Sequence, residues 1–423
     1  MVKANKEIFQ QEYDIAVIGG GPGGLAALLK ANELGINKSI IIERESYPGG
    51  ILPQCIHGGF GLKIFKKELT GPEYNQIFVD KVMDKGLKVL LGTMALNIEN
   101  KDGFKYITVS NKERGFFKIK ARAVILALGC RERTRGQILI PGSRPSGVFT
   151  AGLVQRMVNI EGYLPGKDVV ILGSGDIGLI MARRLFLEGC NVKGVYELMP
   201  FSTGLSRNIV QCLDDYSIPL YYSHTVTKIY GSRRLEAVEI SQVGKDLKPK
   251  AQTNKKIDCD TLLLSVGLIP ENELSKTCGI EIDKCSGGPL VDENLETSVD
   301  GIFSCGNSLF VNDIVDNVTE AGYIAAESAL NYLSSQPEKK NYININSGEN
   351  IAYVVPQKIS AQKNATLRIR VKHPLRNALI TISPVSFQKK YKIIIPGEMV
   401  FLNIQREYLK NLNINDTVVV NAY

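Results

Sequence analysis

The sequence predicts an α/β protein with two Rossmann-like units, followed by a small all-β sandwich at the C-terminus. The α/β part is predicted because a glycine-rich turn between an apolar strand and a helix occurs twice, at 13–35 and 168–189. The sandwich is predicted because about six short β-rich runs, several alternating apolar with polar residues, follow one another after residue 350. A chain of 423 residues is too long for one ordinary core, which agrees with several domains.

The first unit begins with the apolar run 15–18, which is typical of a buried parallel strand. Gly19, Gly21 and Gly24 follow as G-x-G-x-x-G, and good helix formers continue over 25–34. The first glycine permits a tight turn, the second lets a pyrophosphate approach the backbone, and the third allows close packing of helix on strand. The pattern therefore predicts a site where an anion rests at the positive N-terminus of a helix.

An acidic residue follows each glycine-rich turn at the same distance. The strand after the first helix ends in Glu43, nineteen positions beyond Gly24, where a carboxylate accepts hydrogen bonds from an adenosine ribose. In the second unit the next strand ends in Glu197, again nineteen positions after the last glycine. The glycines of this second copy are Gly173, Gly175 and Gly178. Two copies with the same strand, helix and acid predict two dinucleotide-binding units.

Glu197 also bears on which nicotinamide cofactor binds. A carboxylate favours the free 2′-hydroxyl of NADH and repels the 2′-phosphate of NADPH. The first arginine after Glu197 is Arg207, so no guanidinium stands next to the acid. The sequence therefore favours NADH, with NADPH as the alternative.

These motifs make the chain similar to the two-dinucleotide-binding-domain flavoproteins, the FAD/NAD(P) oxidoreductases related to pyridine nucleotide–disulfide reductases such as glutathione reductase. The resemblance covers roughly residues 12–335 and extends to the segments 123–129, 262–272 and 297–307. It implies FAD in the first unit, held by Gly19, Gly21, Pro22, Gly24, Glu43, Arg44, Gly50, Ile51, Gly129, Gly306 and Asn307. It implies NAD(H) in the second unit, held by Gly173, Gly175, Asp176, Ile177, Gly178, Glu197 and Gly267.

The resemblance includes one departure and one further element. Asn307 replaces the acid that the family usually carries in its late FAD motif, so the amide can bond a ribityl hydroxyl but adds no charge. After it we expect a helix opened by Glu320, Ala321 and Gly322. Its N-terminus either points at the pyrimidine edge of the flavin, where its dipole stabilises a reduced flavin, or the helix only packs.

Cys55 and His57 are the candidate catalytic residues, in the glycine-rich stretch 48–61. In the disulfide reductases this loop carries C-x-x-x-x-C, but positions 50 and 60 hold Gly50 and Phe60, and the chain contains no C-x-x-C. Dithiol exchange with a substrate is therefore not expected. Three roles of Cys55 stay open: a peroxidatic thiol that forms a sulfenic acid, a group that tunes the flavin with His57 as proton donor, or packing against the isoalloxazine.

A narrower resemblance concerns partners. The stretches GGILPQCIHGGFG, CGNSLFVNDIVDNVTEAG and IPGEM resemble FAD/NAD-binding subunits that work beside a second flavoprotein similar to glycerol-3-phosphate or 2-hydroxy-acid dehydrogenases, as in opine oxidase and hydrogen cyanide synthase. This implies an electron-transfer subunit of a metabolite dehydrogenase. The cysteine-rich iron–sulfur segment of several relatives is missing, so an iron–sulfur or small electron-transfer subunit would be separate. The alternatives are a stand-alone NADH oxidase or peroxidase using Cys55, and a non-catalytic NADH-responsive redox sensor.

The remaining expectations concern domain limits and location. The formal charge of +8 comes without interleaved aromatic residues, and no apolar run reaches the roughly 18 residues of a membrane helix, so neither nucleic acid nor a membrane span is expected. Eight dispersed cysteines without metal-binding spacing, and no secretory signal, indicate a cytoplasmic protein without a metal. The expected limits are 12–145 for the first FAD-binding part, 146–270 for the NAD(H) domain, 271–335 for the second FAD-binding part, 336–349 for a linker and 350–423 for the β domain.

Overall fold

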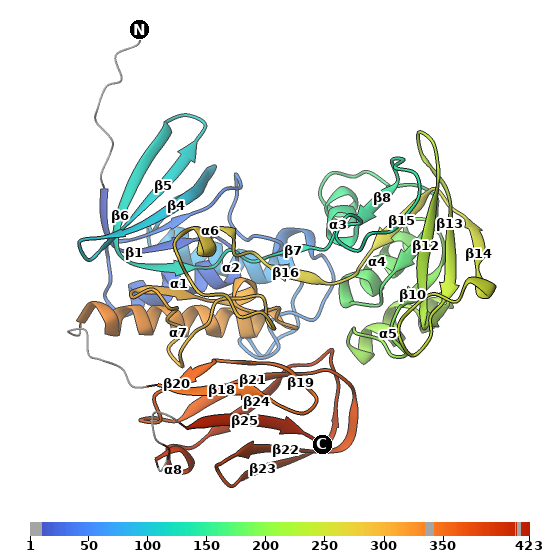
Figure 1. Cartoon of the computed structure of the whole chain (residues 1–423). Helices are drawn as coiled ribbons and strands as arrows, with labels where there is room; N and C mark the ends of the chain where they lie inside the picture. The colour runs from blue at the N-terminus through green and yellow to red at the C-terminus, as the bar shows by residue number, and fades with distance from the viewer. Residues whose placement is uncertain (1–10, 335–341, 411, 413–415) are drawn as a thin grey trace. The chain divides into compact units, whose positions relative to one another are not determined.

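The computed structural model describes residues 11–334, 342–410, 412 and 416–423. The chain divides into two compact units (Figure 1). The first contains the chain up to Pro53, Gly58–Cys130 and Pro270–Tyr423, and the second contains Gln54–His57 and Arg131–Ile269. The chain passes from one to the other in β7 (Cys130–Glu132) and returns in β16 (Leu268–Pro270).

The first unit has a sheet with a parallel core, in the order β3-β2-β1-β6, and β17 also pairs with β6. Beyond β6 the sheet continues with two antiparallel strands, β5 and β4. The strands are β1 (Gln11–Ile18), β2 (Ser39–Ile42), β3 (Lys88–Leu90), β4 (Thr93–Lys101), β5 (Phe104–Asn111), β6 (Gly115–Leu126) and β17 (Ile302–Ser304). The continuous apolar runs in β1, β2 and the end of β6 are buried, as a parallel sheet covered on both faces requires.

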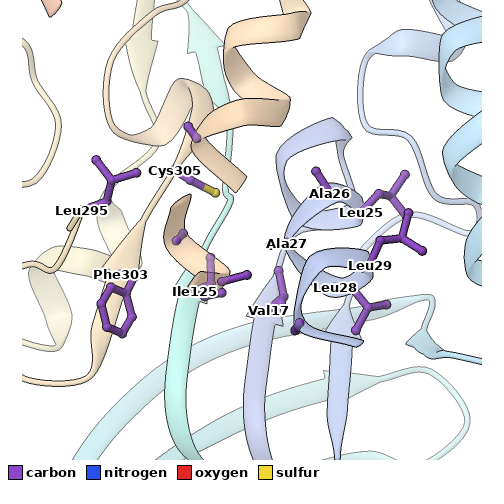
Figure 2. Packing of buried hydrophobic residues seen from close by; sticks show 14 of the residues in the cluster. Val17, Leu25, Ala26, Ala27, Leu28, Leu29, Ile125, Leu295, Phe303 and Cys305 are labelled. Carbon is purple, nitrogen blue, oxygen red and sulfur yellow. The ribbon is translucent and has the colours of Figure 1, made fainter. Parts of the chain in front are cut away.

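Two helices pack side by side on this sheet, α1 (Pro22–Glu33) and α7 (Val315–Ser334). Figure 2 shows that leucines and alanines of α1 form the core with Val17, Ile125 and Cys305. Gly322 of α7 lies against α1, because a Cβ there would be 2.3 Å from the carbonyl oxygen of Gly23. The remaining helices of this unit are α2 (Gly71–Asp84), with a Thr70–Glu73 capping box, and α6 (Glu273–Thr277), with short 3₁₀ turns at Leu52–Gln54 and Gly306–Ser308. Among the residues described, no helix has both the length and the apolar character that a bilayer crossing requires.

The expectation that Glu320 opens the last long helix is wrong, because α7 already begins at Val315. No proline or glycine interrupts the residues before Glu320. The carboxylate of Asp316 lies in the first turn, where the helix dipole favours a negative charge, and accepts hydrogen bonds from the backbone N–H groups of Gly61 (3.2 Å) and Ile64 (2.8 Å). The start of α7 is thereby tied to the loop that follows Cys55 in the sequence.

The second unit repeats the plan of the first. Its parallel sheet has the order β11-β10-β9-β15-β8, and a separate antiparallel sheet contains β12, β13 and β14. The strands are β8 (Val148–Thr150), β9 (Asp168–Leu172), β10 (Asn191–Glu197), β11 (Leu220–Tyr222), β12 (His224–Gly231), β13 (Leu235–Gln242), β14 (Lys255–Asp258) and β15 (Thr261–Leu264). The helices are α3 (Ala151–Asn159), α4 (Asp176–Leu187) and α5 (Ser206–Cys212), with 3₁₀ turns at Asp214–Tyr216 and Ala251–Thr253. The predicted pair of Rossmann-like units is confirmed.

The boundary between the units differs from the expected one. Residues 131–145 belong to the second unit, although the first part of the FAD-binding domain was expected to reach residue 145. The reason is pairing with β12, since the N–H of Ile229 donates to the carbonyl of Pro141 (3.0 Å) and the N–H of Ser143 donates to that of Ile229 (3.1 Å). Such a contact joins segments more than eighty residues apart and has no local sequence signal.

The C-terminal region is a β-sandwich that belongs to the first unit, as the sequence predicts for its strand content. One sheet has the order β20-β18-β25-β22-β23 and the other β19-β21-β24. The strands are β18 (Ile343–Ser347), β19 (Ile351–Val355), β20 (Lys358–Ile359), β21 (Ala365–Val371), β22 (Leu375–Ser383), β23 (Phe387–Ile394), β24 (Val400–Ile404) and β25 (Thr417–Ala422), with one short helix, α8 (Arg406–Leu409). An apolar cluster lies between the two sheets.

The expected linker at 336–349 is corrected in part. β18 lies within that range and pairs in parallel with β25. Its sequence ININS alternates buried and exposed residues, and Ile343 and Ile345 are each 3% exposed. The pattern is that of a half-buried strand, but its polar composition concealed it. Residues 336–341 of the expected linker lie outside the described residues.

Candidate nucleotide-binding sites

The first glycine-rich turn connects β1 to α1 and lies against the end of β6. The N–H of Gly19 donates to the carbonyl of Ile42 (2.9 Å), and the N–H of Ala127 donates to that of Ile18 (2.9 Å). Gly19 has φ +105°, and a Cβ there would be 2.3 Å from the carbonyl oxygen of Ala127. A Cβ on Gly24 would be 1.9 Å from the carbonyl oxygen of Gly19. Both positions therefore exclude any side chain, for the reasons of turn geometry and close packing that the sequence predicts.

Glu43 holds this turn from the end of the neighbouring strand. Its side chain is 5% exposed, and its Oε2 accepts a hydrogen bond from the N–H of Gly20 (2.5 Å). Its Oε1 accepts one from the N–H of Glu45 (2.8 Å). Each carboxylate oxygen has more than one lone pair, so Glu43 retains acceptor capacity for the hydroxyls of a ribose.

The second turn reproduces this geometry around β9 and α4. The N–H of Gly173 donates to the carbonyl of Tyr196 (2.7 Å), and the N–H of Ser265 donates to that of Leu172 (2.7 Å). Gly173 has φ +97°, and a Cβ there would be 2.1 Å from the carbonyl oxygen of Ser265. A Cβ on Gly178 would be 2.6 Å from the Cβ of Ser265. The two turns therefore have the same backbone geometry and the same close contacts with a neighbouring strand.

Glu197 occupies the position that Glu43 has in the first unit. Its Oε2 accepts hydrogen bonds from the N–H (2.8 Å) and the hydroxyl (2.6 Å) of Ser174, and its Oε1 accepts one from the N–H of Met199 (2.9 Å). The side chain is 5% exposed. The only addition to the pattern of Glu43 is the hydroxyl of Ser174, which fixes the carboxylate further.

Both helix N-termini fit the pyrophosphate of a dinucleotide. The N-cap residues Gly21 and Gly175 offer no side chain to the first turn, so its N–H groups remain available to an anion, apart from that of Gly178, which donates to the hydroxyl of Ser265 (3.1 Å). In the first unit Gly50 faces Gly21, and a Cβ on Gly50 would be only 3.2 Å from the Cα of Gly21. Backbone lines this cradle and leaves the room that a phosphate needs, so the residues present fit FAD. The second cradle is bordered by the hydroxyl of Ser265, which is small and polar, and fits the pyrophosphate of a nicotinamide nucleotide.

The other residues expected around FAD differ in how far they are buried. Pro22 occupies the first helical position of α1, and Gly129 and Gly306 have φ +75° and +66°. Ile51 is 50% exposed, and the side chain of Arg44 is 68% exposed, with its nearest acidic group on Glu45 (3.8 Å). The roles of Arg44 and Ile51 in binding FAD stay predictions.

Asn307 organises its own loop. Its Oδ1 accepts hydrogen bonds from the N–H (3.0 Å) and the side-chain amide (3.3 Å) of Asn312, and its Nδ2 lies 3.6 Å from the sulfur of Cys130. Sequence reasoning missed Asn312, because nothing in the loop between the motif and α7 marks it. The amide that replaces the usual acid thus has a structural role in the loop that leads to α7.

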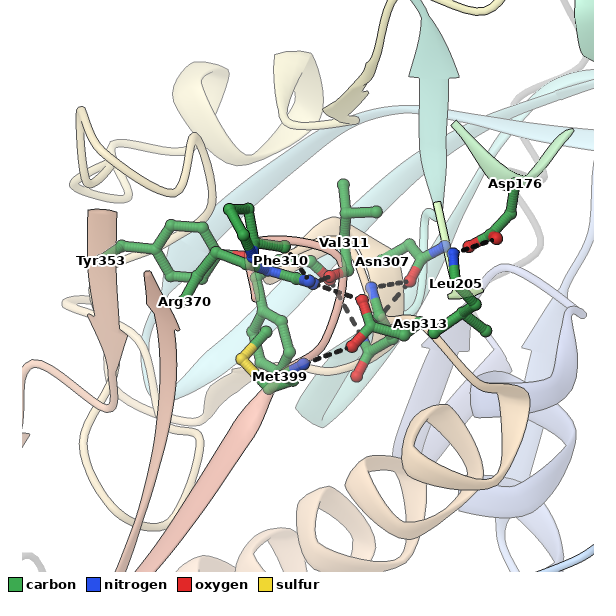
Figure 3. Close-up of polar contacts among 11 residues, drawn as sticks. Asp176, Leu205, Asn307, Phe310, Val311, Asp313, Tyr353, Arg370 and Met399 are labelled. Atoms are coloured by element: carbon green, nitrogen blue, oxygen red, sulfur yellow. Dashed lines mark hydrogen bonds and ion pairs between the residues drawn. The ribbon is translucent and has the colours of Figure 1, made fainter. Parts of the chain in front are cut away.

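Asp176 is the first residue of α4, and its carboxylate binds a segment that follows later in the chain. Its Oδ1 accepts hydrogen bonds from the N–H of Leu205 (2.8 Å) and the side-chain amide of Asn208 (2.6 Å), and Figure 3 shows the bond to Leu205. Asp176 therefore fixes the start of α5 beside the second turn. Asn208 was not predicted, because it follows Asp176 by 32 positions. Ile177 is half-buried, and Gly267, with φ +100°, lies near the side chain of Arg133.

Cys55 belongs to the short segment that the structure groups with the second unit. It is 9% exposed, and its sulfur lies 3.7 Å from Oε1 of Gln155 on α3. Gln54 donates to the same oxygen (3.0 Å) and to the carbonyl of Gly152 (2.9 Å). Burial raises the pKa of the Cys55 thiol to about 12. His57 is half-buried. The thiol thus lacks the accessible thiolate character of a peroxidatic cysteine.

We therefore expect Cys55 to be nearly inert toward iodoacetamide in the native protein. With a pKa of about 12, only about one molecule in ten thousand carries the thiolate at pH 8, and labelling should rise tenfold per pH unit. Mass spectrometry of the native protein labelled at pH 7 and pH 9 measures this. Cys285, which is exposed, is the internal control. Equal labelling of Cys55 and Cys285 would contradict the expectation.

Comparison with known proteins places these sites in a family. The chain is 26% identical to hydrogen cyanide synthase subunit HcnB of Pseudomonas protegens, over 65% of this chain and 60% of that protein, so it matches less than two thirds of that relative. It is 26% identical to ferredoxin–NADP reductase of Picrophilus torridus, over 79% of this chain and 95% of that protein. The crystal structure of T. acidophilum thioredoxin reductase superposes with a TM-score of 0.62 at 23% identity, over 76% of this chain and 99% of that one, which shows the fold alone.

The resemblance inferred from the motifs is confirmed by these comparisons. The family described as pyridine nucleotide-disulphide oxidoreductase matches residues 13–329, a range that contains both turns, both acids and the loop of Asn307. The chain therefore belongs to the pyridine nucleotide-disulphide oxidoreductase family of flavoprotein oxidoreductases.

Proposed function

We propose that this chain is an FAD-dependent NADH oxidoreductase that acts as the electron-transfer subunit of a multi-subunit metabolite dehydrogenase. The observation that carries the proposal is the duplicated cradle, in which Glu43 and Glu197 bind the two glycine-rich turns in the same way. One cradle would hold FAD and the other the nicotinamide nucleotide.

The chain's own residues bind and orient rather than react. The backbone N–H groups at the starts of α1 and α4 hold the pyrophosphates, and Glu43 and Glu197 hold the adenosine riboses. When bound, FAD supplies a flavin that exchanges a hydride with the nicotinamide, a transfer that needs no protein acid or base. This agrees with a thiol at Cys55 that stays protonated.

The choice of NADH over NADPH depends on Glu197. Its carboxylate is buried and bound by three donors, so we expect it to stay in place beside the 2′ position of a bound ribose. Two negative charges brought together in a partly desolvated site repel strongly. The name of the Picrophilus relative points to NADP, so NADPH is the alternative against which the preference for NADH is measured.

The multi-subunit role is supported by the name of one relative. The HcnB relative is named as a subunit of hydrogen cyanide synthase. By analogy the partner here is a second flavoprotein dehydrogenase, with a separate iron–sulfur or small electron-transfer subunit. A stand-alone peroxidase using Cys55 is disfavoured by the burial of the thiol, and a redox sensor would reduce its flavin only slowly.

Anaerobic reduction tests the proposed function. Purified FAD-loaded protein is mixed with NADH in a stopped-flow spectrometer, and the flavin absorbance is followed. We expect bleaching within seconds, at least tenfold faster with NADH than with NADPH at equal concentration. A flavin that stays oxidised with both nucleotides refutes the oxidoreductase proposal, and faster bleaching by NADPH refutes the assignment of Glu197 as an NADH determinant.

A further inference from the structure

β21 has two faces of different character. Leu367, Ile369 and Val371 point into the core of the sandwich and are 0–1% exposed. Because side chains alternate along a strand, Arg368 and Arg370 lie on the opposite face. Arg370 reaches the loop before α7, where it donates to the carbonyl of Val311 (3.0 Å). This face of β21 therefore meets the FAD-binding part of the same unit.

Arg368 is buried on that face without a counterion. It is 9% exposed, and no hydrogen bond or ion pair of its guanidinium occurs within the described residues. Burial lowers its pKa, and the only charge that acts on it appreciably is that of Glu320. None of its nitrogens is among the fully enclosed polar atoms that lack a partner, so they are not completely shut off from solvent. A charge buried in this way is costly unless a partner neutralises it.

A second cation lies close to Arg368. Phe401 of β24 is the cross-strand partner of Arg368, and Nζ of Lys63 lies 5.6 Å from the centre of the Phe401 ring. Lys63 forms an ion pair with Glu320 and lies 3.4 Å from Oδ1 of Asn317 on α7. The side chain of Lys63 is 46% exposed, so this side of the cluster opens to solvent.

Within the part of the chain that the structure describes, no carboxylate of this cluster forms an ion pair with Arg368. The carboxylate of Glu320 acts on Arg368 electrostatically but takes Lys63 as its ion-pair partner. The carboxylate of Asp316 is engaged by the backbone N–H groups of Gly61 and Ile64. The two cations and the two carboxylates match in number, but the buried guanidinium is left without a direct anionic contact.

We propose that Arg368 and Lys63 bind a small oxyanion, such as a phosphate, between β21 and α7. The planar fork of the guanidinium accommodates two oxygens of such an anion, and Lys63 adds a mobile charge at the solvent side. The bound anion bridges the sandwich to α7 and to the 61–64 loop, so its occupancy stabilises the docking of the C-terminal domain. Neither Arg368 nor Lys63 belongs to the two glycine-rich turns, and the proposal does not depend on the proposed function.

Thermal unfolding of the FAD-saturated protein tests the site. Potassium chloride is replaced stepwise by inorganic phosphate at constant ionic strength, with sulfate and acetate as further arms that separate tetrahedral anions from carboxylates. We expect a saturable rise of the wild-type melting temperature with phosphate. Arg368→Met should abolish the rise, and in chloride it should melt no lower than wild type, because it removes an uncompensated charge. Lys63→Met should weaken the apparent affinity several-fold, which covers the case in which the Arg368 variant fails to fold.

Arg376→Met is the matched control, since Arg376 is an exposed arginine of the same sandwich and should keep the wild-type response. Three results overturn the proposal: a wild-type protein without a saturable phosphate shift, an equal shift in wild type and in both Arg368→Met and Lys63→Met, or a shift that disappears when FAD is raised. The last result would place the anion in the flavin cradle instead.

Discussion

Gly178→Val is expected to abolish reduction of the flavin by NADH while leaving the protein yellow. A Cβ at this position would lie 2.6 Å from the Cβ of Ser265 and 2.9 Å from the carbonyl oxygen of Gly173, so the second turn and α4 must separate. Under the proposed assignment the second unit then loses its pyrophosphate cradle, while the first unit, with its own sheet and core, still binds FAD. We expect at least a hundredfold loss of the rate constant for reduction at fixed NADH, with an unchanged FAD content per protein.

Gly136→Ala is the matched control for this experiment. Gly136 lies in the same unit at ordinary φ, and the nearest atom to a Cβ there is 3.8 Å away, so alanine fits. Stopped-flow reduction and the flavin spectrum after gel filtration measure both variants. A Gly178→Val protein that is reduced at the wild-type rate would show that the second cradle does not hold the nicotinamide nucleotide.

Arg370→Met is expected to destabilise the first unit by about 3–5 kcal/mol, the usual cost of removing one partner of a buried ion pair. Arg370 and Asp313 are each 13% exposed, with Nη2 of the arginine 2.5 Å from Oδ1 of the aspartate. Arg370 also donates to the carbonyl of Pro396 (2.8 Å), and the other oxygen of Asp313 accepts from the N–H of Met399 (2.6 Å). Figure 3 shows this network between the sandwich and the loop before α7. Its loss leaves the carboxylate buried with one donor fewer.

Urea unfolding followed by circular dichroism measures the change. Lys118→Met serves as the control, because its ion pair with Glu99 (3.2 Å) is partly exposed, with side chains 34% and 50% accessible, and should contribute less than about 1 kcal/mol. The double variant Arg370→Met with Asp313→Asn should cost less than the sum of the single variants, since neither charge is then left alone. Additive costs would show that the two side chains act independently.

The cradles were predictable from the sequence because their determinants are local. The turns need φ near +100° at Gly19 and Gly173, which glycine adopts most readily. They also leave no room for a side chain at Gly24 and Gly178. The strand before and the helix after each turn have periodicities that single segments reveal. Glu43 and Glu197 follow from the fixed length of a helix and a strand, so the spacing of nineteen residues identified them as well.

The role of Cys55 was not predictable in the same way. Its sequence context, a glycine-rich loop with His57 two positions later, is compatible with three roles. What restricts it is Gln155, a hundred positions further on, together with burial that keeps the thiol protonated. Likewise Asp313 and Arg370 are ordinary charged residues in the sequence. Only their burial as an ion pair makes them important for stability.

The sequence by itself determined that the chain builds two dinucleotide-binding units and a β-sandwich, because turn geometry, strand and helix periodicity and helix length are properties of short segments. The tertiary structure alone decided where the units divide, how the sandwich is attached to α7, and which charges are left buried. Those outcomes depend on burial and on contacts between residues tens to hundreds of positions apart, such as Arg370 with Asp313, and such contacts leave no pattern in the order of the amino acids.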